Sequence, residues 1–278
     1  MRTQFRHLSW RPVAAAAVLA LGSVQASAEI PTDRYWAGLE YFYPTISSTA
    51  HIDATATQRP GTTLSLEDNL DLSDRKGTPY LNLGMRLGEN WRIEFEYYAL
   101  NRSASRVLDR QIEWGDTTFP VGASVNSTFD TTIYRLTGGW SFVKTQQAEA
   151  GLAFGLHITD FKTRLEGQGT GVLTGTGFQS EGHDALAPLP TVGMYGTYAV
   201  APQVFLRGRV DFLSLKYQDY DGRLVNFMGA VDWRVAKNVG VGAGYRYVDY
   251  KLDATKSDFT GEVRYKFKGP TLFVNVGF

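Results

Sequence analysis

Residues 225–235 read VNFMGAVDWRV, and apolar side chains alternate along them with a second, more polar set. The apolar set is Val225, Phe227, Val231, Trp233 and Val235. The second set is Asn226, Met228, Ala230, Asp232 and Arg234. Successive side chains of a strand point to opposite faces, so this period of two predicts a β-strand between two chemically different environments.

The same alternation predicts ten strands along the chain. Their ranges are Tyr35–Pro44, Thr78–Leu87, Trp91–Asn101, Thr128–Phe142, Glu149–Ile158, Pro190–Val200, Gln203–Lys216, Val225–Val235, Val239–Leu252 and Phe259–Phe278. The connections after the even-numbered strands are short turns. Those after the odd-numbered strands are longer, namely Thr45–Gly77, Ser103–Ser127, Lys162–Leu189, Gln218–Gly222 and Asp253–Asp258. We therefore expect one up-and-down antiparallel sheet with turns at one end and loops at the other.

The N-terminus has the pattern of a cleaved secretory signal. Three arginines precede an apolar run from Val13 to Gly22, and Ala26-Ser27-Ala28 is a small-residue cleavage site. The expected signal peptide is 1–28, which leaves 29–278 as a single domain. Of the 278 residues none is Cys, which excludes disulfides, thiolate metal sites and a Cys nucleophile.

The composition argues against two classes of protein. Without the leader the chain holds 25 basic and 28 acidic residues, a balance that argues against nucleic-acid binding. The mean hydropathy is −0.22, and no apolar stretch after the leader approaches the roughly 20 residues of a spanning helix. What stands out is 29 Gly beside 37 aromatic residues, which is typical of all-β chains with tight turns.

An apolar face of about nine to eleven residues per strand suits a tilted strand that crosses a bilayer. The sheet must then close into a barrel, because an open edge would leave unpaired backbone groups in lipid. Aromatic residues near the strand ends are expected to form girdles at the two interfaces: Trp91, Tyr97, Trp140, Trp233, Tyr245 and Tyr247. In the ninth strand the apolar set moves from Tyr247 to Val248, which predicts either a bulge or the exit from the membrane.

The alternative architecture is a soluble barrel of lipocalin type with its apolar face inside. The composition of the other face disfavours it, because glycines and a nearly balanced set of charges suit a narrow lumen of paired ions. The expected lumen network comprises Glu40, Arg86, Arg92, Glu94, Glu96, Arg135, Glu149, His157, Arg207, Arg209, Asp211, Asp232, Arg234, Arg246, Glu262, Arg264 and Lys266.

The C-terminal run Leu272, Val274, Val276 and Phe278 is apolar at every second position and ends the chain in Phe. It resembles the assembly signal of Gram-negative outer-membrane β-barrel proteins. The resemblance implies a cell outer-membrane location, periplasmic termini and turns, and extracellular loops. It also implies a monomer that contacts outer-membrane lipid and lipopolysaccharide, and insertion by barrel assembly machinery with periplasmic chaperones.

Three kinds of chemistry have weak candidates. The omptin proteases use an aspartate pair and an Asp-His pair at the extracellular rim; Asp219, Asp221, His183 and Asp184 fall in predicted loops, but the surrounding motifs do not match. Lipid A deacylases need a membrane-facing His near a Ser, whereas His157 lacks that Ser and lies on the lumen face. A calcium site is conceivable in the first loop, which carries Glu67, Asp68, Asp71 and Asp74, but the spacing is not that of an EF-hand.

Ten strands lie near the filled end of the range of barrel sizes, since eight leave an interior just filled by side chains. We therefore expect a lumen plugged by salt bridges, no cofactor, and a non-enzymatic role in structure or surface interaction through the loops. The alternatives are a narrow channel or transporter for ions or small solutes, and a surface hydrolase.

Overall fold

The computed structural model describes residues 28–56, 59–171, 175–217, 220–255 and 260–278. Its elements in chain order are β1 (Tyr35–Phe42), β2 (Thr45–Ile52), β3 (Leu64–Ser65), α1 (Leu66–Leu70), β4 (Thr78–Leu87), β5 (Trp91–Val107), β6 (Ile112–Trp114), β7 (Thr117–Phe119), β8 (Ser124–Lys144), β9 (Ala148–Gly171), β10 (Gly175–Ala201), β11 (Val204–Tyr217), β12 (Tyr220–Ala236), β13 (Val239–Thr255) and β14 (Thr260–Gly277). No helix among these residues is long and apolar enough to cross a membrane.

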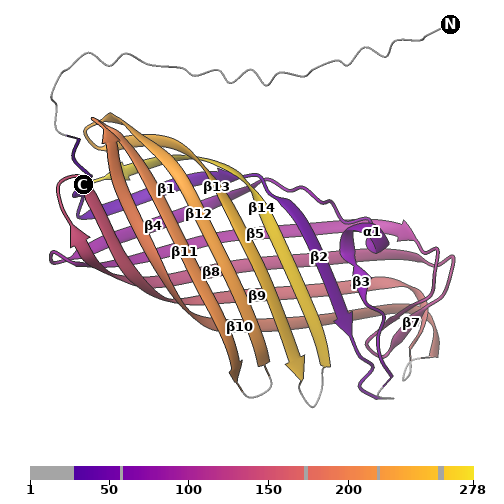
Figure 1. Cartoon of the computed structure of the whole chain (residues 1–278). Coiled ribbons are helices and arrows are strands. Elements are labelled where there is room, and N and C mark those ends of the chain that lie inside the picture. The colour runs from indigo at the N-terminus through magenta and orange to yellow at the C-terminus, as the bar shows by residue number, and fades with distance from the viewer. Residues whose placement is uncertain (1–27, 57–58, 172–174, 218–219, 256–259) are drawn as a thin grey trace, which may run out of the picture.

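Ten of the strands form a closed barrel (Figure 1). The wall runs β1-β4-β5-β8-β9-β10-β11-β12-β13-β14, each strand antiparallel to its neighbours. It closes through β1 and β14, whose register runs from Trp36↔Gly277 to Phe42↔Thr271. The prediction of a ten-stranded up-and-down barrel is confirmed.

The first wall strand is broken and continues further than its sequence predicts. After Tyr43 and Pro44 the chain resumes as β2, which pairs with the N-terminal half of β14 from Thr45↔Lys268 to Ile52↔Gly261. Proline has no backbone N–H to donate to the ladder, so the break falls there. Gly269 lies opposite it, where a Cβ would come within 2.4 Å of the Tyr43 carbonyl oxygen. The expectation that Thr45–Gly77 is wholly a loop is therefore wrong.

The prediction that Lys162–Leu189 is a long loop is also wrong. β9 extends to Gly171 and β10 starts at Gly175, and the two stay paired from Gly175↔Gly171 down to Tyr198↔Ala148. The glycines in this segment suggested a flexible loop, but Phe161 and Leu165 bury their side chains in the barrel and continue the alternation of the strand. β5 likewise continues past its predicted end to Val107, and β8 begins at Ser124, before its predicted start.

Along the strands the outer face of the wall changes from apolar to charged, and the inner face changes from charged to apolar. In β13, Tyr245 is 47% exposed on the outer face, while Arg246 is buried inside. Beyond Tyr247 the outer face carries Asp249, Lys251 and Asp253, and the inner face carries the buried Val248, Tyr250 and Leu252. The ladder has no register shift at this point, so the strand leaves the membrane here without a bulge.

Candidate functional site: the charged lumen

Asp211 is the centre of the ion network in the lumen. Strand alternation turns it inward from β11, where it accepts hydrogen bonds from Arg135 Nη2 at 2.6 Å and from Asn226 Nδ2 at 2.9 Å. Arg135, on β8, also donates through Nη1 to Glu96 of β5 at 2.8 Å. These four side chains are almost fully buried. Glu96–Arg135 and Asp211–Asn226 join neighbouring strands, whereas the Arg135–Asp211 bond joins two strands that are not neighbours in the wall.

Arg209 joins the same network from the position two residues before Asp211. Its Nη2 lies 3.0 Å from Asp211 Oδ1 and donates to Thr137 Oγ1 at 3.0 Å, and its Nη1 reaches Glu94 Oε2 at 2.6 Å. Arg92 lies 3.2 Å from the other oxygen of Glu94 and stacks its guanidinium 3.5 Å from the centre of the Tyr195 ring. Every charged group in this layer therefore has a partner of opposite sign.

Further ion pairs surround this layer. Arg86 binds Glu149 in a bidentate fashion at 2.9 and 2.7 Å, and Ser141 Oγ donates to the same carboxylate at 2.5 Å. Arg246 lies 3.7 Å from Glu40, with its guanidinium 4.3 Å from the centre of the Tyr80 ring. Removing one partner of such a buried pair costs about 3–5 kcal/mol, because the other charge is left uncompensated.

The segment before β1 forms a strap (residues 28–34) across the end of the barrel that carries the short turns. Ile30 is buried against Ala199 and Phe205, and its N–H donates to Gln146 O at 2.7 Å. Asp33 pairs with Arg234, and the Pro31 carbonyl accepts from Arg86 Nη2 at 3.4 Å. The sequence pattern does not predict the contacts of the strap, because alternation identifies strands and carries no signal for an irregular segment.

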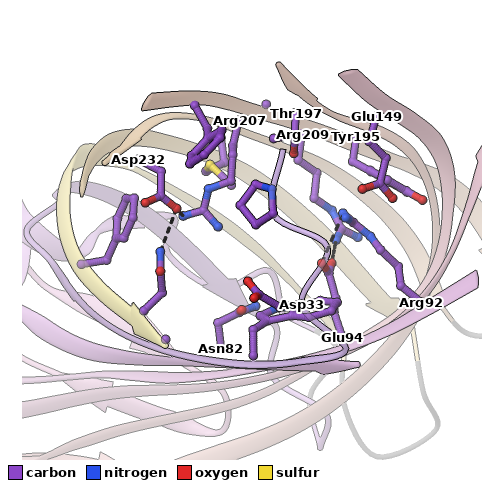
Figure 2. Close-up of a pocket in the computed structure, with 18 of the residues that line it drawn as sticks. Asp33, Asn82, Arg92, Glu94, Glu149, Tyr195, Thr197, Arg207, Arg209 and Asp232 are labelled. Atoms are coloured by element: carbon purple, nitrogen blue, oxygen red, sulfur yellow. Dashed lines mark hydrogen bonds and ion pairs between the residues drawn. The ribbon is translucent and has the colours of Figure 1, made fainter. Parts of the chain in front are cut away.

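A cavity of about 140 Å³ lies between the strap and the ion network. Figure 2 shows acidic and basic side chains facing it from opposite walls, with Asp33 of the strap beside Glu94. Arg207 lines it too, 3.4 Å from Asp232, which also accepts from Asn275 at 2.8 Å. This space is polar and fits several waters.

The extracellular half of the lumen is apolar, contrary to the expectation that salt bridges fill the interior. An aromatic cluster occupies it, with ring centres 5.4 Å apart for Phe129 and Tyr265 and 5.1 Å apart for Phe161 and Tyr250. Leu66 and Leu70 of α1 are buried in the same core and close it from the loop side. Apolar packing excludes water more completely than paired charges do, so this half is the tighter seal.

One buried ion pair sits inside the apolar half. Arg102 of β5 donates to Glu67 of α1 at 2.5 Å and to Ser48 Oγ at 2.8 Å, and Glu67 also accepts from the Ser48 N–H at 2.9 Å. Because Glu67 binds Arg102 and Ser48, it is not available to bind a metal ion together with Asp68, Asp71 and Asp74. Among the residues that the structure describes, no group of three or more His, Asp or Glu side chains could hold a metal ion, so the calcium alternative has no support.

Three residues of the predicted lumen network lie elsewhere. Glu262, Arg264 and Lys266 are on the outer face of β14, beyond the membrane. They share the parity of the outward Leu272 and Val274, so the same strand alternation excludes them from the lumen. Glu262 pairs there with Arg264 at 2.6 Å and Lys251 at 3.2 Å. The other fourteen face the barrel interior: Glu40, Arg86, Arg92, Glu94, Glu96, Arg135, Glu149, His157, Arg207, Arg209, Asp211, Asp232, Arg234 and Arg246.

The residues expected at the lipid surface all point outward. Trp91 and Trp140 face each other across β5 and β8 near the short turns, and Tyr97 packs against Tyr134 with ring centres 5.2 Å apart. Trp233, Tyr245 and Tyr247 lie on the outer face of β12 and β13. The C-terminal Leu272, Val274 and Phe278 are more than half exposed there, and Val276 is half-buried.

The protease-like residues do not converge. His183 and Asp184 are consecutive in β10, so His183 lies on the inner face, 3.6 Å from Glu181, and Asp184 is exposed on the outer face. Asp221 is exposed on β12, and Asp219 lies outside the described residues. His157 is buried in the lumen opposite Arg135 in the β8–β9 ladder, away from the membrane face that a lipid A deacylase requires.

The family model for the outer membrane protein beta-barrel domain matches residues 14–267. This chain belongs to that family. The family lies in the outer membrane of Gram-negative bacteria, so the exposed apolar belt of this barrel faces lipid. The short turns are periplasmic and the long hairpins extracellular.

One solved outer-membrane barrel resembles this family member in fold, and two others give weaker matches. The outer membrane protease OmpT from Escherichia coli matches with a TM-score of 0.58 and 12% identity, over 92% of this chain and 100% of that one. Ail of Yersinia pestis, solved with the heparin analogue sucrose octasulfate, matches with a TM-score of 0.31 and 12% identity over 86% and 99%. The Pseudomonas putida toluene transporter TodX gives 0.34 and 10% over 89% and 91%. A search of curated protein sequences finds no significant match.

Proposed function

We propose that this chain is a non-enzymatic outer-membrane barrel with an occluded lumen, which acts through its extracellular hairpins. The observation that carries this proposal is the double filling of the interior. Paired ions around Asp211 occupy the periplasmic half, and an aromatic and aliphatic core occupies the extracellular half. A solute that crossed would have to separate buried ion pairs and then open a packed core, and both steps are costly.

The narrow-channel alternative rests on the cavity at the periplasmic mouth. That cavity is lined by Arg209 and Glu94, which bond between strands that are not neighbours in the wall. It is therefore a vestibule bounded by the ion network. The hydrolase alternative rests on Asp219, Asp221, His183 and Asp184 for a protease and on His157 for a lipid A-modifying enzyme. It is disfavoured because His183 and Asp184 point to opposite faces of one strand and His157 is buried in the lumen.

The lipid-facing and terminal features take their roles from this proposal. The outward tryptophans and tyrosines anchor the barrel at the two interfaces, and the run from Leu272 to Phe278 is the signal that the assembly machinery recognises. Residues 1–28 are the signal peptide and 29–278 the barrel domain, which is a monomer within its own membrane. Lipopolysaccharide and outer-membrane lipid are its immediate surroundings.

Conductance of the refolded protein in planar bilayers tests the occluded lumen. The expected result is no reproducible conductance step at moderate voltage. Steps that recur in the wild type and change when Arg207 or Arg209 is replaced by Gln would overturn the proposal. The matched control is Arg264→Gln on the outer face of β14, which leaves the lumen untouched.

A further inference from the structure

The extracellular half of β10 has an open edge. Its ladder with β11 covers only Val192↔Phe212 to Ala201↔Val204, whereas its ladder with β9 continues to Gly175↔Gly171. Among the described residues, segment 175–191 therefore has a strand on one side only. Figure 1 shows β9 and β10 reaching well past the extracellular end of β11.

Two prolines mark where the second ladder stops. Pro188 and Pro190 lie just before Val192, the first residue that pairs with β11, and neither has an N–H to donate. Leu189, between them, is buried and packs beside Gly222 of β12. From Leu186 outward to Thr176 the edge contains no proline, and an exposed edge of this kind is a template for another strand.

The residues along this open edge are complementary to themselves about Gly182. In an antiparallel pair centred on that glycine, residue i of one copy lies opposite residue 364 − i of the other. Phe178, which is 64% exposed, then faces the partner's Leu186, which is 57% exposed. Ser180 faces the partner's Asp184 as a hydrogen-bonding pair, and Glu181 faces the partner's His183.

We propose that segment 178–186 of β10 pairs with the same segment of a second copy of this chain, antiparallel and centred on Gly182. Directly opposed apolar pairs and hydrogen-bonding pairs, whether hydroxyl with carboxylate or imidazole with carboxylate, are the units that stabilise neighbouring strands. A two-fold axis makes each pair occur twice, so one self-complementary edge is enough to build the interface. The second copy is favoured over an unrelated peptide because all three kinds of pair arise in a single register.

This pairing places the two barrels in facing membranes. The axis of an antiparallel edge pair is perpendicular to the sheet, which is radial to the barrel and lies in the membrane plane. Rotation about it reverses β10, so the extracellular ends of the two barrels oppose each other. The hairpin lies beyond the lipid, since the first outward charged residues above the apolar belt are Asp160 and Lys162 of β9. The proposed activity is adhesion between cells or vesicles that carry this protein.

Pairing through β10 rests on one part of the proposed function, namely that the barrel acts through its extracellular hairpins. The occluded lumen is independent of it. Conductance steps in a protein that still pairs through β10 would overturn only the occlusion, and silent bilayers with no pairing would overturn only the present inference.

Single-cysteine variants of the full chain test the register directly, because the wild type has no Cys. Gly182→Cys brings its thiol to the two-fold axis, within the roughly 7 Å between Cα atoms that a disulfide allows. A Cβ at this glycine has its nearest neighbours at 3.4 Å, so the fold accepts it. Mild oxidation with copper phenanthroline should give a disulfide-linked dimer. The matched control Thr176→Cys has its own copy twelve positions away, about 40 Å, and should stay monomeric.

A mixture of two variants distinguishes this register from random contact. Ser180→Cys and Asp184→Cys each lie about 14 Å from their own copies but directly opposite one another. Neither variant alone should form a disulfide-linked dimer, and the mixture should form a disulfide-linked mixed dimer. A Gly182→Cys yield no higher than that of Thr176→Cys, or Ser180→Cys linking to itself as readily as to Asp184→Cys, overturns the proposal.

Vesicle clustering tests the facing geometry. Liposomes that carry the refolded protein should cluster in a light-scattering assay, and Phe178→Lys should reduce clustering at least tenfold, because it replaces the apolar contact with the partner's Leu186 by a charge. Thr176→Lys is the matched exposed control near the end of the segment and should cluster as the wild type does. Heat-modifiable gel mobility checks that each variant is folded. Clustering unaffected by Phe178→Lys contradicts the inference.

Discussion

Arg135 on β8 and Asp211 on β11 meet across the barrel at 2.6 Å, and both side chains are almost fully buried. The two strands are separated in the wall by β9 and β10, so this bond spans the lumen rather than joining neighbours in the ladder. It makes the interior a structural element that holds opposite walls together.

Asp211→Asn tests the energetic weight of this contact. The substitution removes the carboxylate that Arg135 and Arg209 share, but Arg135 keeps Glu96 and Arg209 keeps Glu94. We therefore expect the free energy of unfolding to fall by about 1.5–3 kcal/mol. Urea-induced unfolding in lipid vesicles measures it. The control is Asp184→Asn on the outer face of β10, an exposed carboxylate whose loss should cost less than about 1 kcal/mol. Equal effects of the two variants would contradict the central place of Asp211.

The lipid-facing belt of β11 provides a second prediction. Val210 is 43% exposed on the outer face. Val210→Arg places a charge near the bilayer midplane, which should destabilise the folded barrel by about 2–4 kcal/mol. Ser214→Arg adds the same charge on the same face of the same strand, above the membrane, and should change the stability by less than about 1 kcal/mol. The same unfolding assay compares the two variants. Greater destabilisation by Ser214→Arg than by Val210→Arg would contradict the position assigned to the lipid-facing belt.

The strap across the periplasmic mouth makes a prediction about local opening. Ile30→Ala removes most of a buried side chain worth about 1.5–3 kcal/mol, so the strap should open about ten to a hundred times more often. The rate at which a protease cuts within residues 28–34 of the folded barrel should rise by that factor. Glu29→Ala, at an exposed position beside it, is the control. An unchanged rate for Ile30→Ala would mean that Ile30 does not hold the strap.

The outer ion cluster predicts a pH dependence. Partial burial raises the pKa of Glu262, but hydrogen bonds with Arg264, Asp253 and Lys251 outweigh it and lower that pKa to about 2. An unfolded glutamate has a pKa of about 4.3. The ionised form is therefore favoured by folding, and its stabilisation is present above about pH 4.3 and lost as the pH falls toward 2.

Glu262→Gln should accordingly reduce the slope of unfolding free energy against pH between about 4.3 and 2. Arg264→Leu, which removes the first hydrogen-bond donor, should reduce the same slope by raising the pKa of Glu262. Unfolding titrations at several pH values in this window provide the measurement. A slope that neither substitution changes would mean that Glu262 is not a source of acid sensitivity.

Alternation by itself determined the number of wall strands, their order and which side chains share a face. VNFMGAVDWRV lies within β12 in the structure, with Phe227 and Trp233 outside and Asp232 inside. Such a pattern is local, because each side chain needs only its strand to decide which way it points. Inward charges such as Arg135 and Asp211 were identified as lumen residues for the same reason.

Tertiary structure alone decided what each face meets. Glu262, Arg264 and Lys266 were assigned to the wrong face because the outer face changes from lipid to water along a strand, and the apolar set then moves inside without any change of parity. The strap, the turn of Glu67 toward Arg102 and the open edge of β10 depend on segments distant in sequence. Local periodicity records which way a side chain points, but the solvent and the partner on that side are fixed only when the barrel closes.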